Sequence, residues 1–373
     1  MTTQERSPLI WLRCETKPFE HRSALTPTTS KKLIENGFKV IVESDPQRFF
    51  NDSEFEKVGC QIVQHNSWPS APSDALILGL KELPPNDESP LKHTHIMFGH
   101  CYKKQTGYQE ILGRFKSGQG KLLDLEFLQD PITKRRVAAF GFYAGFNGSA
   151  VGLLGISKMI CDSMSLNELK PFKDEDELIK IGQIEFKRLV DKLGRQPKAL
   201  VIGALGRCGS GAVDFFCKVG MDKENIIEWD MAETAKGGPF EEILNVDIFV
   251  NCIYLSSKIP SFVTNETIQA AGPNRPLRMV VDVSCDTTNP NNPIPIYNIN
   301  TTFDQPTTTL KIDDQLPSLE VCSIDHLPTL LPREASEQFS NDLLPTLLQL
   351  KDLSNSKVWS DANDLFNQMV NEI

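Results

Sequence analysis

Two series of short apolar segments, each alternating with amphipathic stretches, constrain the fold of this chain more than any other feature. The first series runs through PLIWLRC, FKVIVES, CQIVQ, DALILGL, THIMFGH and KLLDLEFL. A stretch that starts near Pro27 and stops at Gly37 has the signals of a helix between the first two segments. Apolar runs of this length are typical of parallel strands that helices cover on both faces. We therefore expect an α/β domain over residues 1–134.

The second series lies further along the chain, in KALVIGA, NIIEWD, DIFVNCIY and RMVVDVS, with the helical SGAVDFFCKVG after its first member. Two helical stretches precede it, one rich in small residues at 140–162 and a polar one at 174–194. The segment 286–308 is rich in Pro, Asn and Thr, which predicts a loop with short edge strands. This series predicts a second α/β domain over residues 135–332.

Residues 333–373 are helical, with apolar residues at helical spacing, and we expect them to pack back on the first domain. The first domain would then consist of 1–134 plus 333–373, with the second inserted between these parts. The predicted fold class is α/β, with two Rossmann-like doubly wound domains, a cleft between them and C-terminal helices on the first.

The composition restricts the classes of protein and partner that fit. No apolar run is long enough to cross a bilayer, and the N-terminus lacks a secretory or transit signal, so we expect a cytoplasmic protein without a membrane partner. A net charge of -10 disfavours nucleic acid and leaves small molecules as the expected partners. The nine cysteines lack paired ligand spacing, so no metal site and no disulfide framework are expected.

The glycine cluster GALGRCGSG follows the first strand of the second series and leads into a helix. Its spacing, with Gly203, Gly206 and Gly209, is looser than the dinucleotide fingerprint and is weak as a motif alone. The flanking strand and helix, with Asp230 at the end of the next strand, strengthen the interpretation. An acid there binds the adenosine ribose and repels a 2′-phosphate, so NAD is favoured over NADP. The alternative is a tight turn in which glycine serves steric needs alone.

Ionisable residues follow four strands of the first domain, at the edge where parallel strands end. This edge receives Lys17, His21, Arg22, Lys81, Glu82, His100, Gln105 and Glu126. A lysine and a histidine flanked by two carboxylates suit acid–base chemistry, because desolvation and charge tune their pKa values. Taken singly, these residues have other interpretations: a solvated lysine, a core histidine, surface acids. Lys134, Arg135 and Arg136, between the domains, fit either a solvated linker or a site for pyrophosphate or carboxylates.

Two cysteines lie near the expected cofactor site. Cys208 is inside the glycine cluster and Cys252 follows the strand DIFVN, so the two thiols could be neighbours. In a reducing compartment, two inert buried thiols are the alternative. The residues alone leave both interpretations open.

A set of motifs resembles one family over nearly the whole chain. The motifs are ETKPFEHRSALTP, GLKE, FGHCYK, DLEFL, RRVAAFGFYAGF, IGALGRCGSGA, NCIYLS, VVDVSCDTTNP, SIDHLPTLLPREAS and DLLP. They resemble the fungal, NAD-dependent, lysine-forming saccharopine dehydrogenases of the α-aminoadipate pathway. The resemblance implies an oxidoreductase that transfers hydride from the secondary amine of saccharopine to NAD and hydrolyses the imine to L-lysine and 2-oxoglutarate. It also implies the final step of lysine biosynthesis and a monomer.

The resemblance assigns roles through the matching motifs. Lys81 would accept the proton of the secondary amine, and His100 would assist water attack and imine collapse. Glu82 and Glu126 would set the pKa values of this pair. Substrate contacts would come from Lys17, Arg22, Gln105, Arg136, Phe140, Asp282, Val283 and Ser284. NAD contacts would come from Arg135, Gly206, Arg207, Asp230, Thr234, Tyr254, Val281, Ile324, Asp325, His326 and Leu327. Cys208 and Cys252 would lie close enough to form a disulfide.

Two rival interpretations stay open. An alanine-dehydrogenase-like deaminating enzyme is similar in its two-domain plan, although a substrate with one carboxylate would not need both Arg22 and Arg136. A catalytically silent NAD-binding sensor would retain Asp230 and the glycines, but the intact acid–base set argues against it. The chain ends in VNEI and lacks the S-K-L-type tripeptide of peroxisomal proteins, which favours the cytoplasm.

Overall fold

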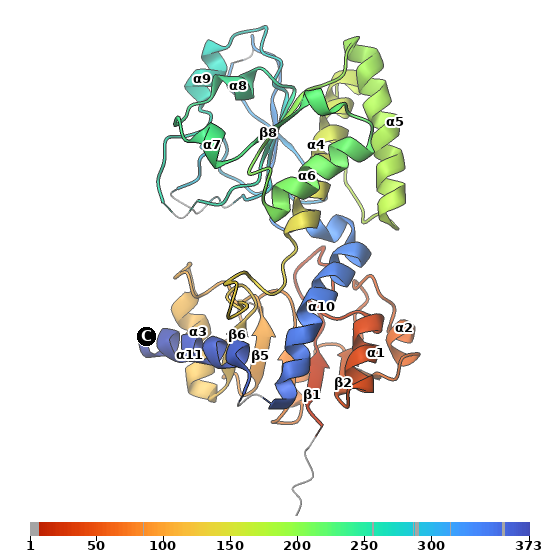
Figure 1. Cartoon of the computed structure of the whole chain (residues 1–373), viewed down its shortest axis with the longest axis vertical. Coiled ribbons are helices and arrows are strands. Elements are labelled where there is room, and N and C mark those ends of the chain that lie inside the picture. The colour runs from red at the N-terminus through yellow and green to blue at the C-terminus, as the bar shows by residue number, and fades with distance from the viewer. Residues whose placement is uncertain are drawn as a thin grey trace, which may run out of the picture. The chain divides into compact units, whose positions relative to one another are not determined.

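The computed structural model of the chain describes residues 7–84, 86–255, 257–285, 287, 291–313, 315–352 and 355–373. The chain divides into two compact units, each built on one six-stranded sheet (Figure 1). The first unit comprises Met1–Ala139 and Pro332–Ile373, and the second comprises Phe140–Leu331. The observed divisions thus lie within a few residues of those expected from sequence, and the α/β fold class is confirmed.

The sheet of the first unit is parallel throughout, in the order β3-β2-β1-β4-β5-β6. Its strands are β1 (Leu9–Leu12), β2 (Lys39–Glu43), β3 (Gln61–Val63), β4 (Leu76–Leu78), β5 (Thr94–Met97) and β6 (Lys121–Asp124). From β1 the chain builds outward to β3 and then returns to place β4 on the other side of β1. The carboxyl ends of β1 and β4 therefore form a switch point, the place where open α/β sheets bind ligands.

The helices of the first unit are α1 (Pro27–Glu35), α2 (Asp52–Glu56), α3 (Tyr108–Gly118), α10 (Pro332–Leu348) and α11 (Lys357–Asn371). The start of α1 follows the predicted signals, since Pro27 occupies its first turn and the Thr26 hydroxyl accepts the N–H of Thr29. Short 3-10 helices, η1 (Trp68–Ser70) and η4 (Gln349–Asp352), complete this unit.

The two C-terminal helices pack on the first unit, as predicted. α10 contacts α1, and close to this contact the Ser336 hydroxyl accepts the N–H of Ser23 at 2.9 Å. α11 contributes Phe366 and Met369 to a buried cluster that also contains Phe115 of α3. The apolar stripe read from the sequence of 333–373 is therefore the face that α10 and α11 bury.

The sheet of the second unit has the order β11-β12-β10-β9-β7-β8, and its switch point lies between β7 and β9. Its strands are β7 (Ala199–Ile202), β8 (Ile226–Trp229), β9 (Ile248–Asn251), β10 (Met279–Asp282), β11 (Thr308–Thr309) and β12 (Glu320–Cys322). The antiparallel β11 is an edge strand at the end of the Pro/Asn/Thr-rich segment, as predicted; residues 286 and 288–290 of that segment lie outside the described residues. The sequence did not predict β12, which is three residues long and begins with the buried Glu320, held by the hydroxyls of Ser165 and Thr307.

The second unit contains α4 (Gly141–Asp162), α5 (Glu175–Leu193), α6 (Arg207–Lys218), α7 (Met231–Thr234), α8 (Glu241–Leu244) and α9 (Asn265–Ala270), with 3-10 helices η2 (Lys223–Asn225) and η3 (Leu327–Leu330). The small residues of α4 let it touch α6 through the backbone. A Cβ on Gly145 would lie 1.8 Å from the carbonyl oxygen of Cys208, and one on Gly211 would lie 2.0 Å from that of Phe142. This contact fixes the helix that begins at the glycine cluster.

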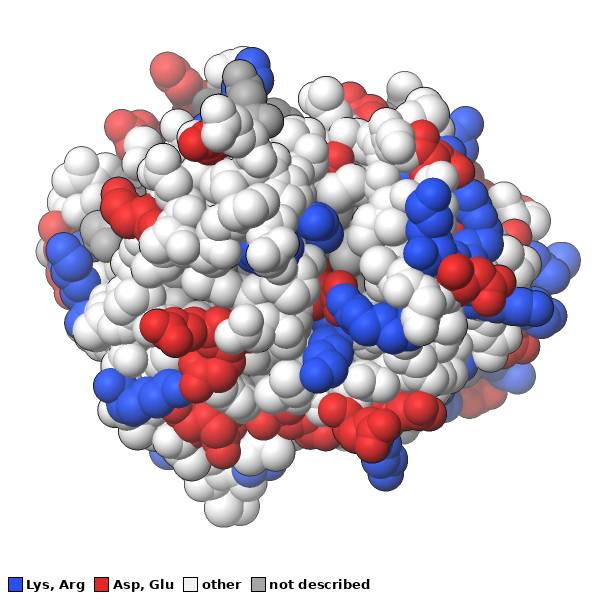
Figure 2. Space-filling view, turned by 90° about the horizontal axis from the view of Figure 1, so that it is seen from above, with Lys and Arg blue, Asp and Glu red and all other residues white. Residues whose placement is uncertain are grey.

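Charged side chains of both signs are scattered over the face of the molecule shown in Figure 2, among larger uncharged areas. Figure 2 shows acidic and basic residues occurring beside one another over much of the face in view. No helix of the described ranges combines the length and the apolar character needed to span a bilayer.

Candidate active site

The carboxyl-end edge of the first sheet gathers acid–base side chains from three strands. Glu82 follows β4 and His100 follows β5, and the Nδ1 atom of His100 lies 3.2 Å from Oε2 of Glu82. Glu126 follows β6, and its Oε1 accepts a hydrogen bond from Lys103 Nζ at 2.7 Å and one from Arg136 Nη2 at 3.3 Å. The structure therefore brings together the predicted Glu82 and His100, and pairs the predicted Glu126 with the predicted Arg136.

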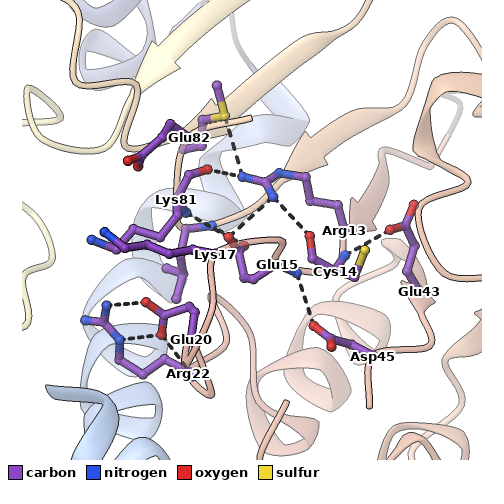
Figure 3. Close-up of polar contacts among 12 residues, drawn as sticks. Arg13, Cys14, Glu15, Lys17, Glu20, Arg22, Glu43, Asp45, Lys81 and Glu82 are labelled. Atoms are coloured by element: carbon purple, nitrogen blue, oxygen red, sulfur yellow. Dashed lines mark hydrogen bonds and ion pairs between the residues drawn. The ribbon is translucent and has the colours of Figure 1, made fainter. Parts of the chain in front are cut away.

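Lys81 comes directly before Glu82 and is buried, with 9% of its surface exposed. Its ammonium group is close enough to Glu82 to favour the ionised carboxylate. Figure 3 shows the side chains of Lys81 and Lys17 extending in the same direction. The buried position excludes the alternative of a solvated strand-end lysine.

Neighbouring charges tune the pKa values of the two glutamates. Burial alone would raise the pKa of Glu82, but the hydrogen bond and charge of His100, together with the charge of Lys81, outweigh it and lower this pKa to about 2. Burial also opposes ionisation of Glu126, yet Lys103 and Arg136 hold its pKa below the usual range. Both carboxylates are ionised at neutral pH and can stabilise positive charge on adjacent groups.

The turn that carries His100 is tightly packed and backbone-strained. His100 has a φ of 49°, in the left-handed region, and a Cβ on Gly99 would lie 2.6 Å from the Leu122 side chain. Buried Asp124 accepts the N–H groups of Gly99 at 3.2 Å and of Glu126 at 2.8 Å, and its burial raises its pKa to about 6. The His100 side chain is 39% exposed, so it is not the core histidine that the sequence also allowed.

A cavity of about 720 Å³ opens beside these residues, within the first unit. Glu82, His100 and Gln105 line one part of it, and α3 lines another. This volume is in the range of pockets that bind small molecules. Gln105 is held in place because its Oε1 accepts the N–H of Lys103 at 3.1 Å.

Arg22 is buried and oriented by an acid that the sequence interpretation missed. Its Nε and Nη2 atoms donate to Oε1 and Oε2 of Glu20, at 2.7 and 2.6 Å (Figure 3). This is the parallel two-bond geometry that makes arginine–carboxylate pairs rigid. A signal was present in the sequence, since a buried arginine needs an acid and Glu20 lies two residues before it.

The glycine cluster in the second unit forms the turn from β7 to α6. Gly203 has a φ of 85°, and its N–H is donated to the carbonyl of Trp229 at the end of β8. Gly206 is the N-cap residue of α6 and has no side chain to occupy the first N–H groups of the helix. A Cβ on Gly209 would lie 2.1 Å from the carbonyl oxygen of Gly203. A turn of bare backbone at the start of a twelve-residue helix fits a pyrophosphate.

Asp230 lies beside this turn, where the dinucleotide interpretation requires an acid. Its Oδ2 accepts the N–H of Leu205 at 3.1 Å, and its Oδ1 accepts the N–H of Met231 at the start of α7. The Thr234 hydroxyl donates to the carbonyl of Asp230 at 2.9 Å. Asp230 and Thr234, both predicted to contact the ribose, thus lie together, and the residues present fit NAD.

Asp282 ends β10 with its carboxylate turned into the unit. It is buried, accepts hydrogen bonds from Tyr297 Oη at 2.6 Å and Asn251 Nδ2 at 2.9 Å, and has its pKa raised by burial. Val283 and Ser284 follow it in the turn after β10. A substrate contact at this strand end would therefore involve the turn rather than a free Asp282 carboxylate.

The remaining predicted cofactor residues differ in exposure. Val281, Ile324 and Leu327 are buried, whereas Tyr254 is 48% exposed. Among the other predicted cofactor residues, Asp325 and His326 pair through Oδ1 and Nδ1 at 2.5 Å, Arg207 begins α6, and the carbonyl of Arg135 accepts the N–H of Asp130. Phe140, which was predicted to contact the substrate, is the N-cap residue of α4. The three buried aliphatic residues have at most 1% of their surface exposed, so a direct contact with NAD stays a prediction.

Cys208 and Cys252 are neighbours in the second unit. Both thiols are free, and they lie close enough to influence each other's ionisation. Burial, and then the Cys208 contact, raise the pKa of Cys252 well above its usual value. The family resemblance implied this proximity, and the disulfide between the two cysteines stays a prediction.

A family model and two solved structures support the fold. The family model, described as "Alanine dehydrogenase/PNT, N-terminal domain", matches residues 11–147. An L-alanine dehydrogenase superposes with a TM-score of 0.67 at 14% identity, covering 96% of this chain and 93% of that chain. A transhydrogenase from Sinorhizobium meliloti gives a TM-score of 0.61 at 16% identity, covering 92% and 95%. At these identities the likeness extends to the fold alone.

The relatives by sequence are much closer. The saccharopine dehydrogenase (NAD(+), L-lysine-forming) of Schizosaccharomyces pombe is 55% identical over 369 residues, which cover 98% of this chain and 100% of that protein. The protein of the same name from Emericella nidulans is 55% identical over 97% of each chain. The mitochondrial alpha-aminoadipic semialdehyde synthase of Mus musculus is 24% identical over 91% of this chain, and the match covers 43% of that protein. With identity above one half over nearly its full length, this chain belongs to the family of NAD(+)-dependent, L-lysine-forming saccharopine dehydrogenases.

Proposed function

We propose that this protein catalyses the last step of lysine biosynthesis, in which saccharopine is oxidised by NAD and the imine is hydrolysed to L-lysine and 2-oxoglutarate. The grouping of Lys81, Glu82 and His100 at one sheet edge carries the proposal. A buried lysine adjoins a glutamate whose Oε2 lies 3.2 Å from the histidine. Amine oxidation followed by hydrolysis requires several proton transfers, and two positioned acid–base groups suit them.

When bound, NAD supplies the acceptor for the hydride. Gly206 and Arg207, at the start of α6, would hold its pyrophosphate, and Asp230 with Thr234 would hold the adenosine ribose. The remaining contacts would come from Arg135, Tyr254, Val281, Ile324, Asp325, His326 and Leu327. The carboxylate of Asp230 disfavours a 2′-phosphate at this position, so NADP binds more weakly.

Lys81 accepts the proton of the secondary amine, which frees the nitrogen lone pair to form the C=N bond as the hydride leaves the adjacent carbon. His100 then removes a proton from the water that attacks the imine carbon. When the C–N bond breaks, His100 returns a proton to the departing amine of lysine, and the hydroxyl group of the carbinolamine releases its proton to solvent as it becomes the carbonyl of 2-oxoglutarate. Glu82 and Glu126 stay ionised and stabilise the positive charge that these two bases acquire.

Saccharopine carries three carboxylates, and the first unit offers cations to meet them. Arg22, held rigid by Glu20, and Arg136, held by Glu126, bind carboxylates through their remaining edges, and Gln105 and Lys17 contribute further substrate contacts. Phe140 and the turn 282–284 complete the substrate contacts. A substrate with one carboxylate would leave these cations unused.

An absorbance assay of NADH tests the proposal. The purified protein is mixed with NADH, L-lysine and 2-oxoglutarate, and in parallel with NADH, pyruvate and ammonia. We expect NADH to be consumed with the first pair only. Consumption with the second pair alone would assign a deaminating activity instead, and NADH binding without consumption would indicate a silent sensor.

Three finer properties belong to the same proposal. The protein acts as a monomer in the cytoplasm, and Cys208 and Cys252 form a disulfide under oxidising conditions. Sedimentation at the mass of one chain and a diffuse cytoplasmic signal from the tagged protein are the expected results. Mass spectrometry of the alkylated protein, before and after a mild oxidant, measures the loss of two free thiols.

A further inference from the structure

The turn that carries Lys81 is held by two side chains from the end of β1. Glu15 accepts the N–H of Leu80 through Oε1 at 2.6 Å and the N–H of Lys81 through Oε2 at 2.9 Å. Arg13 donates to the carbonyl oxygen of Lys81 through Nη2 (Figure 3). Both backbone polar groups of Lys81 are therefore bound to side chains, so the backbone position of the proposed base depends directly on Arg13 and Glu15.

Arg13 and Glu15 also bind each other and are buried. Their Nη1 and Oε2 atoms are 3.3 Å apart, and their side chains are 1% and 5% exposed. Arg13 Nη1 further donates to the carbonyl of Cys14 at 3.0 Å, and the Glu15 N–H is donated to Asp45 Oδ2 at 3.1 Å. The pair is anchored at several points, which limits the positions that the turn can adopt.

The backbone of β4 makes room for this pair. Gly79 lies directly after β4, and a Cβ there would be 2.3 Å from Arg13 Nε and 2.5 Å from Cζ. Any other residue would push the guanidinium away from the Lys81 carbonyl. Gly79, Lys81 and Glu82 belong to the segment GLKE, so one short motif provides the base, its acidic neighbour and the space for the group that holds them.

Stability alone does not account for such a pair. A buried ion pair contributes little net stability, because desolvation offsets most of its attraction, and apolar residues of similar volume often stabilise a core as well. What it supplies is directional hydrogen bonding at fixed distances. In this protein, those bonds are made to the two residues, Leu80 and Lys81, that place the proposed base.

We propose that Arg13 and Glu15 are positioning residues for catalysis: they touch neither substrate nor NAD, and they set the rate by holding the backbone of Lys81. This inference rests on the proposed role of Lys81 as the base. A displacement of about 1 Å at a reacting group can lower turnover by on the order of 100-fold. Loss of either side chain should therefore lower kcat more than it changes KM.

The primary test is Glu15→Gln, which keeps the shape of the side chain. The amide nitrogen of the new glutamine must face the N–H of Leu80 or that of Lys81. Both groups are hydrogen-bond donors, so one of the two hydrogen bonds to the turn is lost. We expect kcat for NADH oxidation with lysine and 2-oxoglutarate to fall by about 10- to 100-fold. The Kd for NADH should change by less than about twofold, because the glycine turn is untouched.

A double-mutant cycle with Lys81→Met separates positioning from general damage. If Glu15 acts through Lys81, Glu15→Gln should lower the residual turnover of Lys81→Met by less than about threefold. The matched control is Asp247→Asn. Asp247 is a buried carboxylate directly before β9 in the second unit, and it accepts hydrogen bonds from Arg195 and from the N–H of Lys198. Any effect of Asp247→Asn should be the same in both backgrounds.

The outcomes distinguish this inference from the proposed function. The positioning role would be overturned if Glu15→Gln lowered kcat by the same factor in wild type and in Lys81→Met. A wild-type kcat in the Glu15→Gln single variant would overturn it as well. Near-normal turnover of Lys81→Met would instead overturn the role of the base itself. If Glu15→Gln does not fold, Arg13→Lys is the second variant, because lysine keeps the charge but has one nitrogen in place of the two that donate. The same loss of kcat, coupled to Lys81, is expected. A wild-type kcat in Arg13→Lys would contradict the inference.

Discussion

The two sheets reverse their strand order at corresponding places, but the residues at the two switch points have opposite character. In the first unit, the ends of β1 and β4 carry the buried ion pair Arg13–Glu15 and the turn with Lys81. In the second, β7 ends in a turn of glycines, with a φ of 85° at Gly203, and α6 begins directly after it. One switch point offers ionisable side chains, and the other offers backbone N–H groups. The same topology thus suits proton transfer in one unit and phosphate binding in the other.

Glycine illustrates the difference, because each switch point needs it for a separate reason. Gly79 leaves space for a guanidinium, since a Cβ would approach Arg13 Nε to 2.3 Å. Gly209 leaves space for the main chain, since a Cβ would approach the Gly203 carbonyl oxygen to 2.1 Å. Changes at the first switch point should therefore alter turnover, and changes at the second should alter nucleotide affinity.

The largest expected effect comes from removing the charge at the first switch point. Lys81→Met should lower turnover by on the order of 100- to 10,000-fold, the usual contribution of an acid–base group. The Kd for NADH, measured by fluorescence, should stay within about twofold of wild type. Lys121→Met is the control, because Lys121 lies at the amino end of β6, away from the carboxyl ends that carry the site, and its Nζ donates to Asn363 on the surface. A large loss of NADH affinity in Lys81→Met would contradict the separation of roles.

A second prediction uses the buried carboxylate behind His100. Burial raises the pKa of Asp124 to about 6 from 3.8, so the folded protein binds this proton more tightly than the unfolded chain does. The resulting stabilisation is complete below pH 3.8 and is lost as the pH rises through about 6, a change of about 3 kcal/mol. Urea unfolding of wild type and Asp124→Asn between pH 4 and 7.5 should show wild type losing stability relative to the variant. A pH-independent difference would place the pKa of Asp124 near its ordinary value.

The glycine turn gives the third prediction. Gly209→Ala should weaken NADH binding by about 10- to 100-fold, since overpacking of this kind costs about 1–3 kcal/mol. The measurement is NADH fluorescence titration. Gly182→Ala is the control, because its new methyl group on α5 would lie 2.7 Å from the Val219 side chain, away from the glycine turn, so affinity should be unchanged. Equal Kd values for Gly209→Ala and wild type would show that the turn can expand without affecting the nucleotide.

The smallest expected effect concerns the acid beside the turn. Asp230→Ala should weaken NADH binding by about 5- to 10-fold and narrow the difference between NADH and NADPH, because the ribose loses its acceptor. The substitution also removes the cap of α7, which by itself costs about 1 kcal/mol of stability. Asp174→Ala removes the matching cap of α5, where Asp174 accepts the N–H of Glu177, and should leave both affinities unchanged. If both variants lose NADH affinity equally, the effect of Asp230 is structural.

Local patterns were enough to predict most of the elements. Apolar runs predicted the strands of both sheets, and the signals at Pro27 and Gly37 predicted α1. β12 escaped notice because its first residue, Glu320, is an acid, and the hydroxyls that satisfy it come from Ser165 and Thr307. Strand prediction from hydrophobicity cannot anticipate a buried acid whose partners lie elsewhere in the chain.

The candidate site shows the same limit. Residues at strand ends were predictable, because parallel strands end at one edge, and Lys81, Glu82, His100 and Glu126 all lie there. The groups that hold them were missed: Glu15 bonds to a backbone N–H 66 residues away, and Asp124 bonds to one 25 residues away. When a carboxylate accepts a hydrogen bond from a backbone N–H far away in the sequence, the residues around it give no sign of that bond.

The backbone contact between α4 and α6 has a consequence for anyone who would re-engineer this enzyme. Gly145 and Gly211 each face a carbonyl oxygen of the opposite helix at a distance that excludes even a methyl group. In a library randomised at these two positions, only variants that keep glycine at both should retain the packing of the two helices. Solvent-facing positions of the same helices tolerate other residues. Directed evolution by single substitutions therefore cannot adjust the spacing of α4 and α6 beneath the glycine turn, because every single replacement of either glycine disrupts the contact.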